Sequence, residues 1–352
     1  MTQVIPRSVD LIGTTLDVSG VGGPPLSKRQ EPIADVSLVG SWLGRYQVIS
    51  RLGEGSMGVV YAARDPGLDR TVALKLLPPL DPERHQHLEA RLHREAQALA
   101  RLDHPNVVSV HDVGMSEHGM FVVMRLVEGE SLAERIAYTR TTRSHIVRLF
   151  IAAGSGLAAA HDAGIVHRDF KPAYVLVDAR DRVFVVDFGL ACSGDHIDPC
   201  NYELGPAFDL MTEDGGIVGT PFYMSPEQHR GEPATARSDQ FAFAVSLWTA
   251  LFHRHPFGAH SPDSHRALSR MRADRVIPPR KNAGVPRRVV RALRRALRHD
   301  PEARWPSMHA LLAELEPCTR RSRGTTKAVI AAAVLAALWA NAVAAAAAAH
   351  AP

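Results

Sequence analysis

The sequence has few cysteines, no internal repeat and no apolar segment close to its first residue. Its three cysteines, Cys192, Cys200 and Cys318, form neither a paired framework nor a zinc-binding spacing, and so sparse and odd a number is typical of a chain kept in the reducing cytosol. Residues 1–45 mix Pro, Gly, Ser and Thr without periodicity. We therefore expect a flexible leader there and not a signal peptide.

The sequence also lacks a large excess of either acidic or basic residues, since its net charge is only +4 over 352 residues. With 45% hydrophobic and 22% charged residues, the composition is that of an ordinary globular chain and not of a disordered one. The most basic run, residues 287–298, has Val and Leu at helical spacing and predicts an amphipathic helix with a solvated arginine face; docking on acidic lipid or a partner is the alternative. Nothing in the pattern indicates nucleic-acid recognition.

One long uncharged segment is present, at the C-terminal end. Residues 328–349 are 22 uncharged residues, long enough as a helix at about 1.5 Å per residue to cross a bilayer. Basic side chains in residues 317–327 precede it, so the positive-inside rule places the preceding domain in the cytoplasm. This predicts a basic juxtamembrane linker and a transmembrane helix; an alanine-rich soluble tail is the alternative.

A glycine-rich stretch occupies residues 52–60, with Gly53, Gly55 and Gly58 in the spacing G-x-G-x-x-G-x-V. A dinucleotide-binding turn should open a helix, but the β-branched and aromatic residues at 59–63 predict a strand. Two strands joined by a glycine flap suit a cover over phosphate groups, because glycine lets the backbone approach their oxygens closely.

Further motifs combine apolar strands with charged side chains. Lys75 ends the strand pattern 72–75. Residues 83–102, which include Glu95, have helical spacing and predict an apolar face formed by Leu88, Leu92, Ala96 and Leu99. A buried strand is predicted at 121–124, and a second, at 183–186, leads into Asp187-Phe188-Gly189. Between these two strands lies the stretch 167–174, with the sequence HRDFKPAY.

In their order along the chain these motifs resemble those of the eukaryotic-type protein kinases, and most of all bacterial receptor-like serine/threonine kinases. The resemblance also covers Gly219-Thr220-Pro221, Ser225-Pro226-Glu227, Asp239 and Arg304, of which the family pairs Glu227 with Arg304. It implies an α+β, bilobal kinase fold over residues 46–316, with a β-rich N-lobe, one long helix there, and a helical C-lobe. The kinase domain would lie in the cytoplasm, anchored in the inner (plasma) membrane by the C-terminal helix.

The resemblance also assigns roles to residues of the site. Asp169 would be the catalytic base, Lys171 and Lys75 would neutralise phosphate charge, and Glu95 would hold Lys75. Asp187 would bind Mg²⁺, with Mn²⁺ as an alternative ion, and Lys171 indicates serine or threonine as the acceptor. The ATP-binding set is Gly53, Gly55, Gly58, Val60, Ala73, Lys75, Met124 as the gatekeeper, the backbones of Arg125 and Val127, and Leu176.

Regulation is expected in the segment between Asp187 and Glu227. Arg168 precedes the catalytic Asp and calls for an anionic partner, for which a phosphorylated Thr212 is the first candidate and Thr220 the second. The acidic residues Glu213 and Asp214 are a further hypothetical source of that charge. The implied partners are a protein substrate, ATP, the membrane, and a second copy of the chain for autophosphorylation.

One residue departs from the family pattern H-R-D-x-x-x-x-N, because Tyr174 stands where the second metal-binding Asn is expected. Magnesium prefers oxygen ligands in tight octahedral geometry, and a protonated phenol on a rigid ring is a poor substitute for a short amide. Two interpretations stay open: a weakened serine/threonine kinase, and a nucleotide-binding pseudokinase that acts as a membrane-tethered scaffold. A third variant has the ring swing aside while water completes the metal shell.

Overall fold

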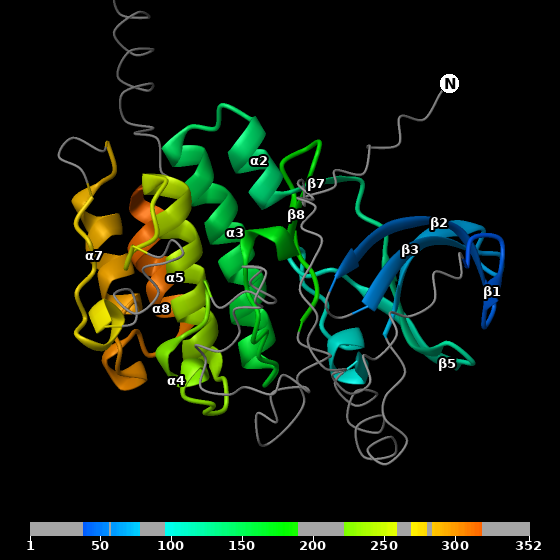
Figure 1. The fold of residues 1–352 in the computed structure, drawn as a ribbon. Coiled ribbons are helices and arrows are strands. Elements are labelled where there is room, and N and C mark those ends of the chain that lie inside the picture. The colour runs from blue at the N-terminus through cyan, green and yellow to red at the C-terminus, as the bar shows by residue number, and fades with distance from the viewer. Residues whose placement is uncertain are drawn as a thin grey trace, which may run out of the picture.

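In a computed structural model of the chain, the described residues are 38–55, 58–77, 96–188, 222–258, 269–279 and 284–318. An antiparallel sheet forms one end of the molecule and a group of helices forms the other, as Figure 1 shows. This confirms the α+β, two-lobed architecture. The expected membrane helix at 328–349 and residues 1–37 of the expected leader lie outside the described residues. The rest of that leader, residues 38–45, is instead part of the N-lobe, because Trp42 and Leu43 form a strand and Leu38 and Leu43 are buried in an N-lobe apolar cluster. Within the described part of the chain, no helix is long and apolar enough to cross a membrane.

The N-lobe is built on a six-stranded sheet in which all neighbours are antiparallel, in the order β1-β2-β3-β4-β6-β5. Its strands are β1 (Trp42–Leu43), β2 (Tyr46–Gly55), β3 (Gly58–Asp65), β4 (Arg70–Leu76), β5 (Val110–Ser116) and β6 (Gly119–Arg125). The glycine stretch forms the β2–β3 hairpin, as its sequence predicts, with Gly55 opposite Gly58.

Strand alternation gives this sheet two apolar faces with different neighbours. Val72 and Leu74 of β4 belong to an N-lobe cluster with Tyr46 and Phe121. Ala73, between them, points to the opposite face and joins the main core of the molecule. Since Lys75 follows Ala73 by two positions, the period of two puts its side chain on the face that looks toward the C-lobe.

The N-lobe helix expected at 83–102 is described only in its last part. Residues 96–100 are helical, and Ala96 and Leu99, both predicted for the apolar face, are buried in the main core. Leu88, Leu92 and Glu95 lie outside the described residues.

The C-lobe is mainly helical. Its described helices are α2 (Leu132–Tyr138), α3 (Arg143–Asp162), α4 (Pro226–His229), α5 (Ala236–Phe252), α7 (Arg287–Ala296) and α8 (Met308–Leu315). Helix α5 is buried almost all round, which fits its continuous apolar sequence, and α3, α7 and α8 pack around it. Helix α7 confirms the amphipathic helix predicted from the basic run, because its Val289, Ala292 and Leu293 are buried while Arg291 is exposed.

A small sheet lies between the two lobes and carries the loops of the site. It consists of β7 (Gly129–Ser131), β8 (Val175–Asp178) and β9 (Val183–Val185) in the order β7-β8-β9. Asn106 attaches β9 to the chain that leads into the N-lobe: its amide donates to the Val183 carbonyl at 2.9 Å, and its carbonyl accepts from the Val185 amide at 2.9 Å. Helix α3 approaches this junction so closely that a Cβ at Gly156 would lie 2.4 Å from the Asn106 carbonyl oxygen, so only glycine fits there.

Candidate active site

Strand register brings most of the expected ATP-binding residues together in the N-lobe. Val60 of β3 is opposite both Gly53 of β2 and Lys75 of β4, and Ala73 is opposite Met124 of β6. These positions form one band across three strand pairs, from the glycine hairpin to the gatekeeper position. The sequence motifs are far apart along the chain, and antiparallel pairing is what joins them.

The hinge after β6 leaves this band toward the C-lobe. The Arg125 amide donates to the Ser109 carbonyl at 2.9 Å, and the guanidinium carbon of Arg125 lies 4.9 Å from the centre of the Phe184 ring in β9. Arg125 thus makes a cation–π contact with Phe184 of the small sheet between the lobes. Leu176 of β8 lies opposite Phe184, and Val127 packs against the main core.

Lys75 and Asp187 form an ion pair in which the lysine is buried and the aspartate partly buried. The Nζ atom of Lys75 lies 2.9 Å from Oδ1 of Asp187, and their side chains are 5% and 17% exposed. The expected partner Glu95 lies outside the described residues, so its pairing with Lys75 stays a prediction. In this structure the lysine expected at the phosphates and the aspartate expected at the metal are in direct contact, and a nucleotide would enter between or beside them.

Asp239 of α5 fixes the backbone of the loop that carries Asp169. Its Oδ2 accepts from the His167 amide at 2.7 Å and its Oδ1 accepts from the Arg168 amide at 2.8 Å. The His161 ring is a third partner, with Nε2 2.8 Å from Oδ2. Because Asp239 is only 1% exposed, these are hydrogen bonds of a buried carboxylate, which are shorter and stronger than neutral ones.

His167 joins this loop to the strand that precedes Asp187. Its Nε2 lies 3.0 Å from the Val186 carbonyl oxygen, and its ring centre lies 4.8 Å from that of Phe188 and 5.7 Å from that of Phe170. Burial lowers the pKa of His167, and the imidazole is therefore neutral and donates from Nε2. The Val186 amide in turn donates to the Tyr174 carbonyl at 2.9 Å, so Val186 ties both ends of the loop beside Asp187.

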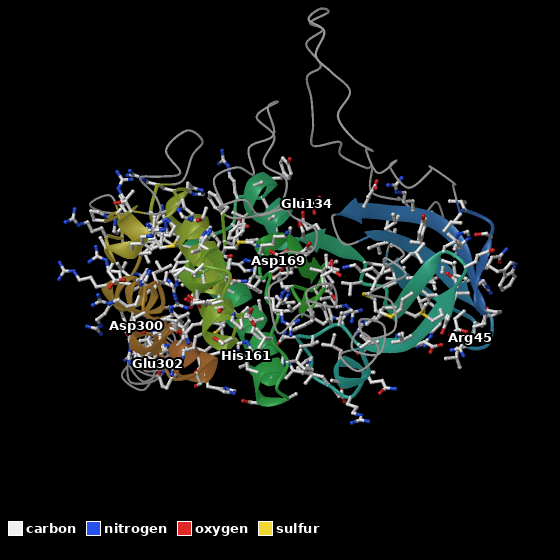
Figure 2. All side chains as sticks on the ribbon, turned by 60° about the horizontal axis from the view of Figure 1, so that its bottom comes forward. Arg45, Glu134, His161, Asp169, Asp300 and Glu302 are labelled. Carbon is white, nitrogen blue, oxygen red and sulfur yellow. The ribbon has the colours of Figure 1, made fainter. Side chains whose placement is uncertain are left out.

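Asp169 lies between the two lobes, as Figure 2 shows, far from Arg45 at the outer end of the sheet and from Asp300 and Glu302 among the C-lobe helices. The Nζ atom of Lys171 donates to its Oδ2 at 3.0 Å. The same ammonium lies 4.2 Å from the centre of the Tyr174 ring. Asp169 and Lys171 are partly buried, with 26% and 14% of the side chain exposed.

These residues suit a nucleoside triphosphate with one divalent cation better than with two. Lys75 and Lys171 supply positive charge and Asp187 supplies a carboxylate, while no atom of the described residues lies within 4 Å of a Cβ built on Gly53. The second metal position of the family needs the Asn amide oxygen, but Tyr174 presents an aromatic face to Lys171 instead. The donor set therefore fits the first ion and does not fit the second.

A second polar connection anchors the loop to α4. The Gln228 amide donates to the Arg168 carbonyl at 2.8 Å. Beside Gln228, Glu227 forms the predicted pair with Arg304, at 2.7 Å and 2.8 Å for the two oxygens, and Ser238 donates to one of them at 2.8 Å. Burial opposes ionisation of Glu227, but the hydrogen bonds from Arg304 outweigh it, so the pKa of Glu227 is below its usual value.

The expected regulatory residues are described only in part. Arg168 has a left-handed backbone with φ +69°, held by the Asp239 and Gln228 contacts. Thr212 and Thr220 lie outside the described residues.

Sequence reasoning missed three contacts: that of Gln228 with the Arg168 carbonyl, that of His161 with Asp239, and that of Lys171 with Tyr174. Only the last had a signal in the sequence, since an aromatic residue three positions after a lysine can reach it within one turn.

Comparison with known proteins agrees with this geometry. Residues 46–315 match the family model of the protein kinase domain. Serine/threonine-protein kinase pkn3 of Myxococcus xanthus is 36% identical over 294 residues, which cover 79% of this chain and 51% of that protein. Serine/threonine-protein kinase PrkC of Bacillus subtilis is 34% identical over 274 residues, which cover 78% of this chain and 40% of that protein. This chain thus spans about half the length, or less, of these relatives.

Among solved structures, the kinase domain of Mycobacterium tuberculosis PknI superposes with a TM-score of 0.59 at 25% identity. The superposition covers 80% of this chain and 98% of that domain.

Proposed function

Because the chain belongs to the protein kinase family, we propose that it transfers the γ-phosphoryl group of ATP to serine or threonine hydroxyls of proteins. The observation that carries this proposal is the pair of hydrogen bonds by which Val186 holds His167 and Tyr174, at the two ends of the loop. It brings the loop with Asp169 and Lys171 beside Asp187, which itself contacts Lys75. The charged groups that phosphoryl transfer requires are therefore gathered at one place between the lobes.

In the proposed reaction the oxygen of the substrate hydroxyl forms a bond to the γ-phosphorus, and the bond from that phosphorus to the bridging oxygen of ADP breaks. Asp169 orients the hydroxyl and accepts its proton. Lys171, 3.0 Å from Asp169, and Lys75 neutralise the charge of the phosphate oxygens. Both relatives are named serine/threonine-protein kinases, which supports serine or threonine as the residue that accepts the phosphoryl group.

The family uses ATP together with a divalent cation. When bound, the cation draws negative charge from the phosphate oxygens and so favours transfer. We propose Asp187 as its ligand, with Mg²⁺ as the usual ion and Mn²⁺ as an alternative. The proposed nucleotide contacts in the N-lobe are Gly53, Gly55, Gly58, Val60, Ala73 and Met124. Those that follow are the backbones of Arg125 and Val127, at the end of β6 and just after it, and Leu176 of β8.

A nucleotide-binding scaffold without turnover is the second candidate, because Tyr174 replaces a metal ligand. Mutation of a residue that only supports a metal ligand typically lowers metal affinity or activity about 10–100-fold, and loss of a direct ligand should lower them at least as much. The names of the relatives and the intact set Lys75, Asp169, Lys171 and Asp187 favour the enzyme.

Autophosphorylation of the full-length chain decides between the two. Purified protein is incubated with radiolabelled ATP and either Mg²⁺ or Mn²⁺, beside Asp169→Ala and the control Asp162→Ala, an exposed carboxylate at the end of α3. We expect incorporation in the wild type and in Asp162→Ala, and none in Asp169→Ala. Binding of ATP without incorporation under either ion would contradict the enzyme and support the scaffold.

For regulation, we propose that a phosphorylated Thr212 pairs with Arg168, with Thr220 as the lesser candidate, and that a second copy of the chain supplies the phosphate. Mass spectrometry after incubation with ATP should find phosphate on Thr212. Thr212→Ala should then incorporate less phosphate and transfer it more slowly than Thr220→Ser.

The segment 328–349 is proposed, from its length and lack of charge, to anchor the kinase domain 46–316 in the inner membrane through the basic linker 317–327. The full chain should float with lipid vesicles in a density gradient, whereas a chain ending at residue 327 should stay at the bottom. Equal flotation of both chains would contradict the proposal that residues 328–349 are the membrane anchor.

A further inference from the structure

Tyr174 is held between the loop and the strand that leads to Asp187. It ends the short 3-10 helix Pro172–Tyr174, its amide donates to the Lys171 carbonyl at 2.9 Å, and its carbonyl accepts from the Val186 amide at 2.9 Å. Its ring is nearly parallel to the His167 imidazole, with an angle of 25° and 6.1 Å between centres. The backbone of Tyr174 is thus held from both the loop and the strand that leads to Asp187, and its ring lies against the loop residue His167.

The ring of Tyr174 lies against the ammonium of Lys171, at 4.2 Å from Nζ to the ring centre. The same ammonium donates to Asp169 at 3.0 Å. A lysine side chain has about four rotatable bonds and loses much conformational freedom when it is ordered. Two attractive contacts, one with a carboxylate and one with a π face, keep the charge at a single place with only 14% of the side chain exposed.

We propose that Tyr174 is a positioning residue that holds the Lys171 ammonium beside Asp169, and that the site takes one divalent cation per nucleotide instead of two. The proposal rests on the proposed kinase function. A tyrosine removes an oxygen ligand and with it the positive charge of the second ion. The ring compensates by fixing another positive charge, that of Lys171, next to the group that receives the substrate proton.

Two measurements test this without any turnover. The first is the rate at which an amine-acylating reagent labels Lys171 in the full-length chain, read by mass spectrometry of its peptide. We expect Tyr174→Leu, which removes the π face, to label about 2- to 30-fold faster than the wild type, the range that corresponds to a cation–π contact. Tyr174→Phe, which keeps the ring, should label at the wild-type rate, and so should the control Tyr138→Leu at an exposed tyrosine of α2.

The second measurement is the number of Mn²⁺ ions bound per molecule in the presence of a non-hydrolysable ATP analogue, counted by electron paramagnetic resonance. The wild type, Tyr174→Phe and Tyr174→Leu should bind one ion, and Tyr174→Asn should bind two. Two ions in the wild type, or labelling of Lys171 that is unchanged in Tyr174→Leu, would overturn the proposal.

Kinetics add a third test if the chain transfers phosphate. Tyr174→Leu should lower kcat by about 2- to 30-fold with little change in KM for ATP, because the lost contact orders a charge used in the transition state. Tyr174→Phe should recover most of that loss. A wild type that binds the analogue but transfers no phosphate would refute the kinase function alone, since labelling and ion counting would still decide the role of Tyr174.

Discussion

The buried pair of Arg304 with Glu227 gives the sharpest prediction for stability. The two side chains are 0% and 4% exposed, and both guanidinium nitrogens that face Glu227 donate to it. Arg304 also donates to the carbonyls of Arg298, Arg237 and His299 at 2.8 to 3.1 Å. One side chain therefore joins the start of α4, the start of α5 and the loop after α7.

Arg304→Met removes the guanidinium and leaves the Glu227 carboxylate buried with Ser238 as its remaining side-chain partner. Removal of one partner from a buried pair costs about 3–5 kcal/mol. For a cooperative unit of 150–250 residues this corresponds to a fall in Tm of roughly 6–20 °C. The control is Arg294→Met, which removes an exposed arginine of α7 and should change Tm by less than about 2 °C.

The assay is thermal and urea unfolding followed by tryptophan fluorescence, since Trp248 and Trp305 both lie in the C-lobe. A double variant, Glu227→Leu with Arg304→Met, should lose less stability than the sum of the single variants, because no buried charge is left without its partner. If Arg304→Met unfolds at the same temperature as Arg294→Met, the reasoning is refuted.

The same pair has a defined dependence on pH. The folded-state pKa of Glu227 lies below its ordinary value of 4.5, so the stability it contributes is present above that value and is lost as the pH falls through the lower, folded-state pKa. In Arg304→Met burial acts without the hydrogen bonds from Arg304, the largest cause that opposes it, and should raise the pKa of Glu227 instead. The difference in stability between wild type and variant should therefore shrink as the pH is lowered from 7 to 4.

Two further predictions concern the backbone of the site. Gly58→Ala should cost about 1–3 kcal/mol in thermal unfolding, because Gly58 has φ +115° and its new Cβ would lie 2.1 Å from the Leu76 carbonyl oxygen. Gly53→Ala is the control, since its Cβ would meet no atom of the described residues within 4 Å, and equal costs would contradict the argument. Asp239→Asn should cost about 1–3 kcal/mol and slow phosphoryl transfer, because the His167 and Arg168 amides each donate to a different carboxylate oxygen and the NH₂ group that replaces one of them cannot accept. An unchanged urea midpoint together with an unchanged rate would show that the loop does not depend on Asp239.

Much of the architecture was predictable because local rules and motif order agree. The strands at 58–65, 70–76 and 119–125 follow from β-branched and apolar residues, and α7 follows from its helical spacing. The pairing of Glu227 with Arg304 was confirmed as the family resemblance implies. The roles assigned to the site residues remain predictions, since only geometry has been observed for them.

What the sequence by itself determined is the family, the order of the elements and the residue types available for chemistry, because these depend on local pattern and on spacing. Only the tertiary structure decided which of those groups meet. Lys75 lies against Asp187, Asp239 holds the backbone of residues 167 and 168, and Lys171 lies on the ring of Tyr174. Strand register and helix packing set these distances, and both depend on contacts between segments tens of residues apart, which no local pattern encodes.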